Sequence, residues 1–92
     1  MNDLLTIFNT YGKSHQVSKL LEEVGEFIET VINEDKKNMV QEIADVMVLL
    51  EQFKLYYEIT SEEITEVFWS KVERQLEGIK NETVAKDEWI KD

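Results

Sequence analysis

Residues 42–50 read Glu42-Ile43-Ala44-Asp45-Val46-Met47-Val48-Leu49-Leu50, a largely apolar run that contains two acids. The run belongs to a longer segment, residues 37–57, whose apolar side chains cover most of a helical circumference. A helix that is apolar on nearly every side must be covered on more than one side. We therefore expect this segment to be a helix enclosed by the other helices of the chain or by a second subunit.

Outside this segment, apolar residues recur at spacings of three and four, which predicts further helices. The fold class is therefore all-α. We expect one compact four-helix domain over residues 1–80 and a C-terminal tail over residues 81–92. The expected helices span residues 3–11, 14–33, 37–57 and 60–77.

Residues that favour helix ends lie at the expected boundaries. Gly12 and Gly78 are predicted to end the first and the fourth helix. Ser14 and Asp35 are the predicted N-caps of the second and third. Thr60-Ser61-Glu62-Glu63 has the sequence pattern of a capping box at the start of the fourth.

Length and composition exclude several classes of protein. The chain has 92 residues, no cysteine and no proline. It therefore has no disulfide framework, no thiolate metal site and no cysteine nucleophile. A domain of this size buries only about 60–65% of its unfolded surface, so a lone monomer would be marginal and self-association is an option.

Charge and hydropathy exclude others. The net charge of −10 argues against direct binding of nucleic acid through a basic surface. The longest apolar run, Val46 to Leu50, is far shorter than the roughly 20 residues that span a bilayer. The first residues lack the basic start of a signal peptide. We expect a cytoplasmic protein that has no membrane partner.

Two acids in the apolar segment need an explanation. Asp45 lies inside it, and Glu42, three residues earlier, lies on the same face of the helix. Two like charges on a helix that is largely covered by protein are costly unless a cation lies between them.

The preceding helix carries a matching pair, Glu23 and Glu26. If the two helices pack antiparallel, four carboxylates converge, which is a donor set for Mg²⁺ or Mn²⁺. A di-iron site would instead need Glu-x-x-His on two helices, and His15 is the only histidine. Glu26 lies almost opposite the apolar stripe of its helix, so either another helix or subunit closes that side or Glu26 is a surface acid.

Lys71 lies in the middle of the apolar face of the fourth helix, and Arg74 follows one turn later. Lys71 either extends its ammonium group to water, as lysine stems allow, or directs its charge toward the carboxylates or a bound phosphate.

Four aromatic residues are candidates for stacking on a base, with ordinary packing as the alternative: Phe27, Tyr56, Tyr57 and Trp69.

Glu22-Glu23-Val24-Gly25-Glu26, followed after fifteen residues by Glu42-Ile43-Ala44-Asp45, resembles the EExxE…ExxD signature of the MazG-like, all-α nucleoside triphosphate pyrophosphatases. The similarity covers roughly residues 11–79. It includes Tyr11-Gly12, Gln16, the stretch 42–52 and the stretch 71–76.

The resemblance implies a helical domain that forms a dimer or tetramer around a helical bundle. The implied activity is Mg²⁺-dependent hydrolysis of a nucleoside triphosphate to a monophosphate and pyrophosphate. The resemblance assigns Glu23, Glu26, Glu42 and Asp45 to the metal. The catalytic residues it implies are Glu22, in a supporting or general-base role, Lys71 and Arg74. Lys71, Arg74 and Gln16 are the implied substrate contacts. Lys71 and Arg74 would meet phosphate oxygens.

A second reading stays open on the sequence alone. A small acidic helical module can act without catalysis, either as a mimic of nucleic acid or as a nucleotide sensor. The net charge of −10 favours the mimic, and the mimic predicts that binding does not depend on metal.

Overall fold

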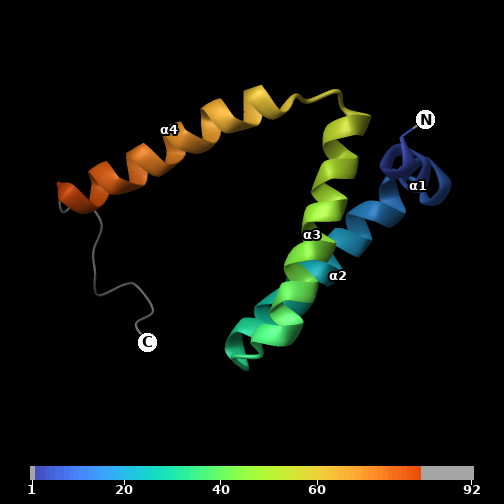
Figure 1. Cartoon of the computed structure of the whole chain (residues 1–92), viewed down its shortest axis with the longest axis horizontal. Helices are drawn as coiled ribbons and strands as arrows, with labels where there is room; N and C mark the ends of the chain where they lie inside the picture. Colours follow the sequence, from blue (N-terminus) through green and yellow to red (C-terminus); the bar gives the residue numbers. More distant parts are fainter. Residues whose placement is uncertain (1, 82–92) are drawn as a thin grey trace. The chain divides into compact units, whose positions relative to one another are not determined.

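The computed structural model describes residues 2–81, which form four α-helices and no strand. This confirms the all-α fold class, whereas assembly into an oligomeric bundle stays a prediction. All but the first residue of the predicted tail, residues 81–92, lies outside the described residues. The helices are α1 (Asp3–Tyr11), α2 (Lys13–Ile32), α3 (Lys36–Tyr56) and α4 (Ser61–Lys80) (Figure 1).

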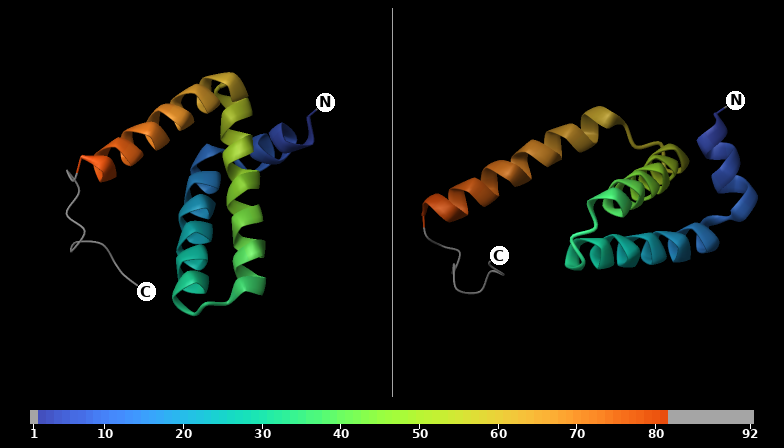
Figure 2. Two further views of the ribbon diagram at one scale, coloured as in Figure 1. Left: turned by 60° about the vertical axis from the view of Figure 1, so that its left-hand side comes forward. Right: turned by 60° about the horizontal axis from the view of Figure 1, so that its bottom comes forward.

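The chain divides into two compact units, residues 1–59 and residues 60–92. In the first unit α2 and α3 form an antiparallel hairpin, and α1 packs against both (Figure 2). Phe8 of α1 is 1% exposed; its ring lies 5.1 Å from that of Phe53 and 4.5 Å from that of Tyr56. These rings fix α1 on the C-terminal end of α3.

The junction between α1 and α2 is a single residue, Gly12, at φ 90° and ψ 156°. Its N–H donates to the Phe8 carbonyl at 2.8 Å, and its carbonyl accepts from the Gln16 N–H at 3.0 Å. Gly12 therefore ends one helix and begins the next without a side-chain cap. The predicted Ser14 cap is wrong, because α2 begins at Lys13 and Ser14 lies in its first turn.

Two other predicted caps are confirmed, and one predicted helix end is wrong. Asp35 caps α3 by accepting from the Asn38 N–H at 3.2 Å. Thr60 and Glu63 form both hydrogen bonds of the capping box at the start of α4. Gly78 does not end α4, which continues to Lys80. A glycine inside a helix costs only about 1 kcal/mol relative to alanine, so it does not by itself end one.

Most of the apolar stripe of α2 is not covered by α3. Leu21 is 72% exposed and Ile28 is 50% exposed, whereas Gln16 and Glu23 are buried. The face of α2 toward α3 is therefore rich in polar residues. On α3, Met47 is 59% exposed, so the expected enclosure of this helix is not complete within residues 1–59.

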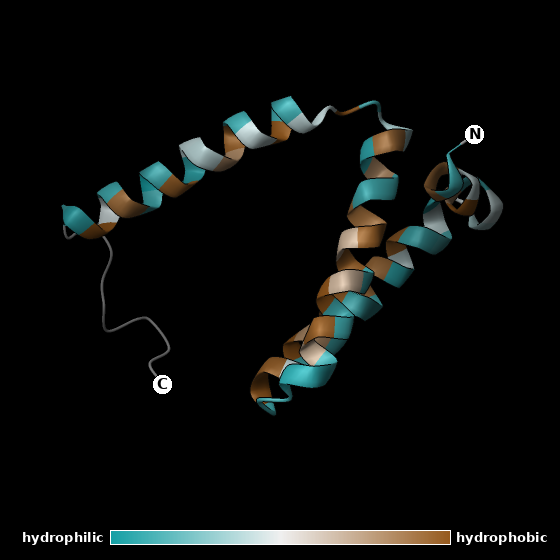
Figure 3. Cartoon of the chain, viewed as in Figure 1, coloured by the Kyte–Doolittle hydropathy of each residue, from teal (hydrophilic) through white to brown (hydrophobic). Residues whose placement is uncertain are grey.

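Helix α4 has no buried residue. Apolar residues recur along its whole length (Figure 3). Among residues 2–81, no helix is both long and apolar enough to cross a lipid bilayer.

We predict that Gly12→Ala destabilises the protein by about 1–3 kcal/mol, the usual cost of holding a non-glycine residue in this region of backbone space. A Cβ at Gly12 meets no atom within 4 Å, so the cost arises from the backbone and not from a clash. Urea unfolding measures it.

Gly25→Ala is the matched control, because Gly25 lies inside α2 and its Cβ position is also open. This substitution should stabilise by up to about 1 kcal/mol through helix propensity. Equal effects of the two substitutions would contradict the role assigned to Gly12.

Candidate metal centre

The register of the α2–α3 hairpin is marked by one buried hydrogen bond. Gln16 Nε2 donates to Gln52 Oε1 at 2.8 Å, and the two side chains are 3% and 2% exposed. In an antiparallel pair, a step forward along one helix matches a step back along the other. Glu23, seven residues after Gln16, therefore lies opposite Asp45, seven residues before Gln52. Seven residues are two helical turns, so both pairs lie on the same strip of the hairpin.

The same register places Glu26 opposite Glu42, and the carboxylates form one cluster. Oxygen atoms of Glu23, Glu42 and Asp45 lie within 4.8 Å of one another, as do those of Glu22, Glu23 and Glu26. Glu26 also lies close enough to Glu42 to perturb its ionisation. The four acids predicted as metal ligands thus meet within the first unit. Glu26 reaches them without α4 or another subunit, because the polar face of α2 is the one that packs on α3.

Two oxygens of the cluster are unsatisfied. Oε2 of Glu23 and Oε2 of Glu42 are buried, and no donor among the described residues reaches either atom. A buried acceptor that has no partner costs free energy. A hard divalent cation satisfies several carboxylate oxygens at once. The residues present therefore fit Mg²⁺ or Mn²⁺.

Without a bound metal ion, repulsion between the carboxylates favours a proton on one of them. The neighbouring Glu23 carboxylate is the main cause that raises the pKa of Glu42 to about 7; loss of solvation and the charge of Glu26 add to it. The same contact with Glu42 lowers the pKa of Glu23, and Lys19 lowers it further. The Glu23 carboxylate thus favours the protonated form of Glu42, and a divalent cation would displace that proton.

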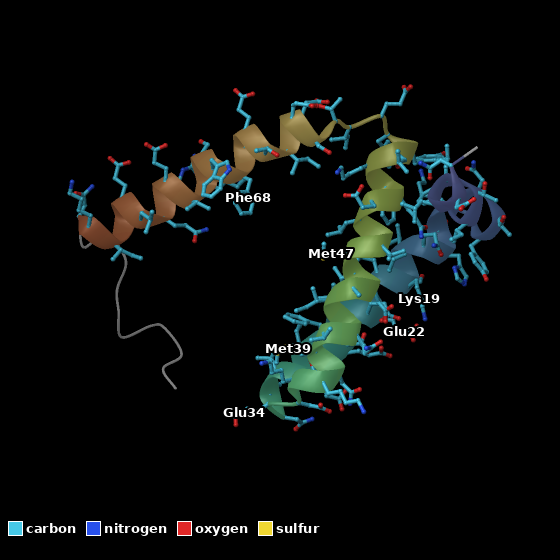
Figure 4. The ribbon with its side chains drawn as sticks, in the orientation of Figure 1. Lys19, Glu22, Glu34, Met39, Met47 and Phe68 are labelled. Atoms are coloured by element: carbon cyan, nitrogen blue, oxygen red, sulfur yellow. The ribbon has the colours of Figure 1, made fainter. Side chains whose placement is uncertain are left out.

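Lys19, which the sequence analysis missed, is the cation already present at this site. Its Nζ lies 3.2 Å from Glu23 Oε1. It also lies 3.6 Å from Oε1 of Glu22, which is labelled beside it in Figure 4. Hydrogen bonding to Glu23 is the main cause that raises the pKa of Lys19. Its spacing of three and four residues from the two acids is the usual signal of an ion pair on one helix face, and could have identified it.

A cavity of about 600 Å³ adjoins the cluster, and Glu22, Glu23 and Asp45 are part of its wall. Gln16, predicted to bind substrate, lines it, as does Gln52, which the sequence analysis did not single out. Helical spacing from Asp45 was the available signal for Gln52. The rest of the wall comprises Tyr11, His15, Lys19, Val48 and Leu49.

The predicted stacking aromatics of the first unit, Phe27, Tyr56 and Tyr57, do not belong to this wall. Tyr56 packs between Phe8 and Tyr57 instead.

The remaining predicted site residues lie on α4, in the second unit. Lys71 and Arg74 are three residues apart and both are exposed, so their roles toward the substrate stay predictions. Trp69 is 61% exposed and its ring meets that of Phe68 edge to face at 5.1 Å.

We predict that the metal-free protein loses stability relative to Glu42→Gln as pH rises from about 4.5 to about 7. The folded state holds the Glu42 proton up to a pKa of about 7, whereas the unfolded chain releases it near the ordinary glutamate pKa of 4.5. Between these values the native state binds more protons, so its stability falls with rising pH. Urea unfolding in the presence of EDTA measures the difference between the two proteins.

A constant difference between the two proteins from pH 4 to pH 8 would contradict the shared proton. With Mg²⁺ present, the account predicts that wild type loses this pH dependence, because the cation takes the place of the proton.

The model of the MazG nucleotide pyrophosphohydrolase domain matches residues 12–78. This range contains all the carboxylates of the cluster and both glutamines of the cavity. Comparisons with curated proteins and with solved structures found no match. Since the family model spans well over half of the 92 residues, the chain belongs to the MazG nucleotide pyrophosphohydrolase family.

Proposed function

We propose that this protein hydrolyses nucleoside triphosphates, ribo or deoxy, to the monophosphate and pyrophosphate, with Mg²⁺ as cofactor and Mn²⁺ as a possible substitute. The observation that carries the proposal is the convergence of four carboxylates on one strip of the α2–α3 hairpin, with two of their oxygens buried and unsatisfied. Membership of the MazG family supports the reaction class.

Glu23, Glu26, Glu42 and Asp45 are the proposed metal ligands. A bound Mg²⁺ would neutralise the facing charges of carboxylates and triphosphate, polarise the phosphoryl oxygen and lower the pKa of a bound water. Because acids from two helices contribute, the site depends on the hairpin register.

Glu22 is the proposed general base. It borders the cavity, and one of its oxygens lies within 4.8 Å of oxygens of Glu23 and Glu26. In the proposed reaction, water attacks the α-phosphorus and gives its proton to Glu22. The bond from the α-phosphorus to the bridging oxygen breaks, and pyrophosphate leaves with that oxygen.

Basic residues balance the charge of the phosphates. Lys71 and Arg74 are the proposed phosphate contacts on α4, and Gln16 contacts the substrate from the cavity wall. Lys19 adds a positive charge at the same wall.

The proposed assembly is a homodimer or homotetramer. Its support is the apolar surface that residues 2–81 leave exposed, including the stripe of α2 around Leu21 and the apolar residues of α4 such as Phe68 and Trp69. Burial of such surface is the main favourable term in association. The proposed role is control of the nucleotide pool in the cytoplasm.

Incubation of the purified protein with a panel of triphosphates and Mg²⁺ should release pyrophosphate. Asp45→Asn should lower kcat/KM at least about 100-fold, since even the partners of metal ligands are typically worth about 10–100-fold. Glu22→Gln should lower kcat by about 10²–10⁴-fold, as removal of a general base does. Initial rates of pyrophosphate release, followed by chromatography of the products, measure both effects.

Glu29→Gln is the matched control, because Glu29 is an exposed acid on α2 outside the cluster; it should keep wild-type activity. Full activity of Asp45→Asn would disprove the site.

Millimolar Mg²⁺ should raise the melting temperature of wild type by several degrees, since a ligand that binds only the folded state stabilises it by about 2.7 kcal/mol at 100 times its Kd. Asp45→Asn should lose this shift. If wild type shows neither a shift in melting temperature nor turnover, the non-catalytic acidic module is favoured instead.

A further inference from the structure

A chain of three hydrogen-bonded side chains lines the cavity about two helical turns from the carboxylates. His15 Nδ1 lies 2.8 Å from Gln16 Oε1, and Gln16 Nε2 donates to Gln52 Oε1 at 2.8 Å. Gln16 and Gln52 are both nine-tenths buried or more, yet both are part of the cavity wall. Buried amides are costly unless their hydrogen bonds are satisfied, so this chain is a built feature of the site.

The chain has a direction. Gln16 uses its oxygen toward His15, which donates in the tautomer that carries a proton on Nδ1, and uses its nitrogen toward Gln52. The oxygen of Gln52 is thus occupied as an acceptor. Its Nε2 carries two N–H groups that no described residue accepts. The free polar function that Gln52 offers to the cavity is therefore a hydrogen-bond donor.

A flat aromatic surface borders the same cavity. The rings of Tyr11 and His15 are stacked, with centroids 4.8 Å apart and planes 17° apart. Tyr11 is 59% exposed, so a face of the stack is open. Stacking on such a surface is sequence-tolerant, because every base has a π-face.

The spacing matches the parts of a nucleotide. Gln16 and Gln52 lie seven residues from Glu23 and Asp45 along α2 and α3, which is about 10 Å along the hairpin. A nucleotide held by its phosphates at the carboxylates would extend its sugar along the cavity and bring its base to the amide and the aromatic stack.

On the basis of the proposed function, we propose that Gln52 reads the base edge, and that the site selects bases with a carbonyl group where adenine and cytosine carry an amino group. An N–H donor of Gln52 pairs with that carbonyl oxygen. An exocyclic amino group is itself a donor, so it would face the Gln52 donor without an acceptor. A site built to hydrogen-bond one group rejects the analogue that lacks it.

The test uses two matched pairs of deoxynucleoside triphosphates with the full chain and Mg²⁺: dITP against dATP, and dUTP against dCTP. The members of each pair differ at this exocyclic group and in the hydrogen on the ring nitrogen beside it. Wild type should show a kcat/KM at least about tenfold higher for the carbonyl member of at least one pair. Hydrolysis that favours neither carbonyl member would overturn the proposal and leave the proposed reaction intact.

Gln52→Glu supplies the second arm. The carboxylate still accepts from Gln16 Nε2 but has no N–H to donate, so the preference should fall at least about tenfold. Gln41→Glu is the matched control, since Gln41 is exposed on the same helix and lies outside the cavity wall; it should keep the wild-type preference. An unchanged preference in Gln52→Glu, shown to be folded by circular dichroism, would overturn the role of Gln52.

Binding separates this proposal from the reaction. If no triphosphate is hydrolysed, the proposed function is wrong. Calorimetric titration of wild type with the matched monophosphates, dIMP against dAMP and dUMP against dCMP, then decides the base assignment. Tighter binding of a carbonyl member would support it, and equal binding in both pairs would overturn it, including when Gln52→Glu does not fold.

Discussion

Repulsion between carboxylates that the α2–α3 hairpin forces together is the constraint on which the rest of the site depends. Glu23 is 5% exposed, and the neighbouring Glu42 has a buried oxygen that no described donor reaches. Two ionised groups cannot share such a place without compensation. Either Glu42 keeps a proton, because the neighbouring Glu23 carboxylate raises its pKa to about 7, or a divalent cation binds. A proton on Glu42 and a bound divalent cation are thus two alternative ways of reducing the repulsion between the carboxylates.

Because of the hairpin register, the candidate site has two ends, with the Gln16–Gln52 pair at one and the carboxylates at the other. One hydrogen bond, from Gln16 to Gln52, marks the pairing of the helices. Two turns away the same pairing brings Glu23 and Asp45 together. The phosphate end and the base end of the cavity therefore share one strip of the hairpin, and a slip of the helices would disrupt both.

Much of the fold followed from the sequence. Helical periodicity and the caps at Asp35 and Thr60 located the helices within a few residues, because these signals are local. The ends near Ser14 and Gly78 were wrong. At the first, Gly12 occupies the N-cap position and no side chain caps α2. At the second, glycine is tolerated inside a helix.

The candidate site was only partly predictable. The four acids of the cluster were found from their spacing, and the structure brings them together. The side of α2 that packs on α3 could not be predicted from hydropathy, since Leu21 and its apolar neighbours stay exposed while Glu23 is buried. The expected reason is that the apolar stripe serves a contact between subunits. Lys19 and Gln52 were not predicted as site residues, because they belong to the site only when this side of α2 packs on α3.

The most direct test of the central claim is a crystal structure with Mn²⁺, whose anomalous scattering locates the ion independently of the protein atoms. The account predicts an anomalous peak among the carboxylates of Glu23, Glu26, Glu42 and Asp45. A structure in which those side chains point into solvent and no peak lies between them would contradict the proposed metal site.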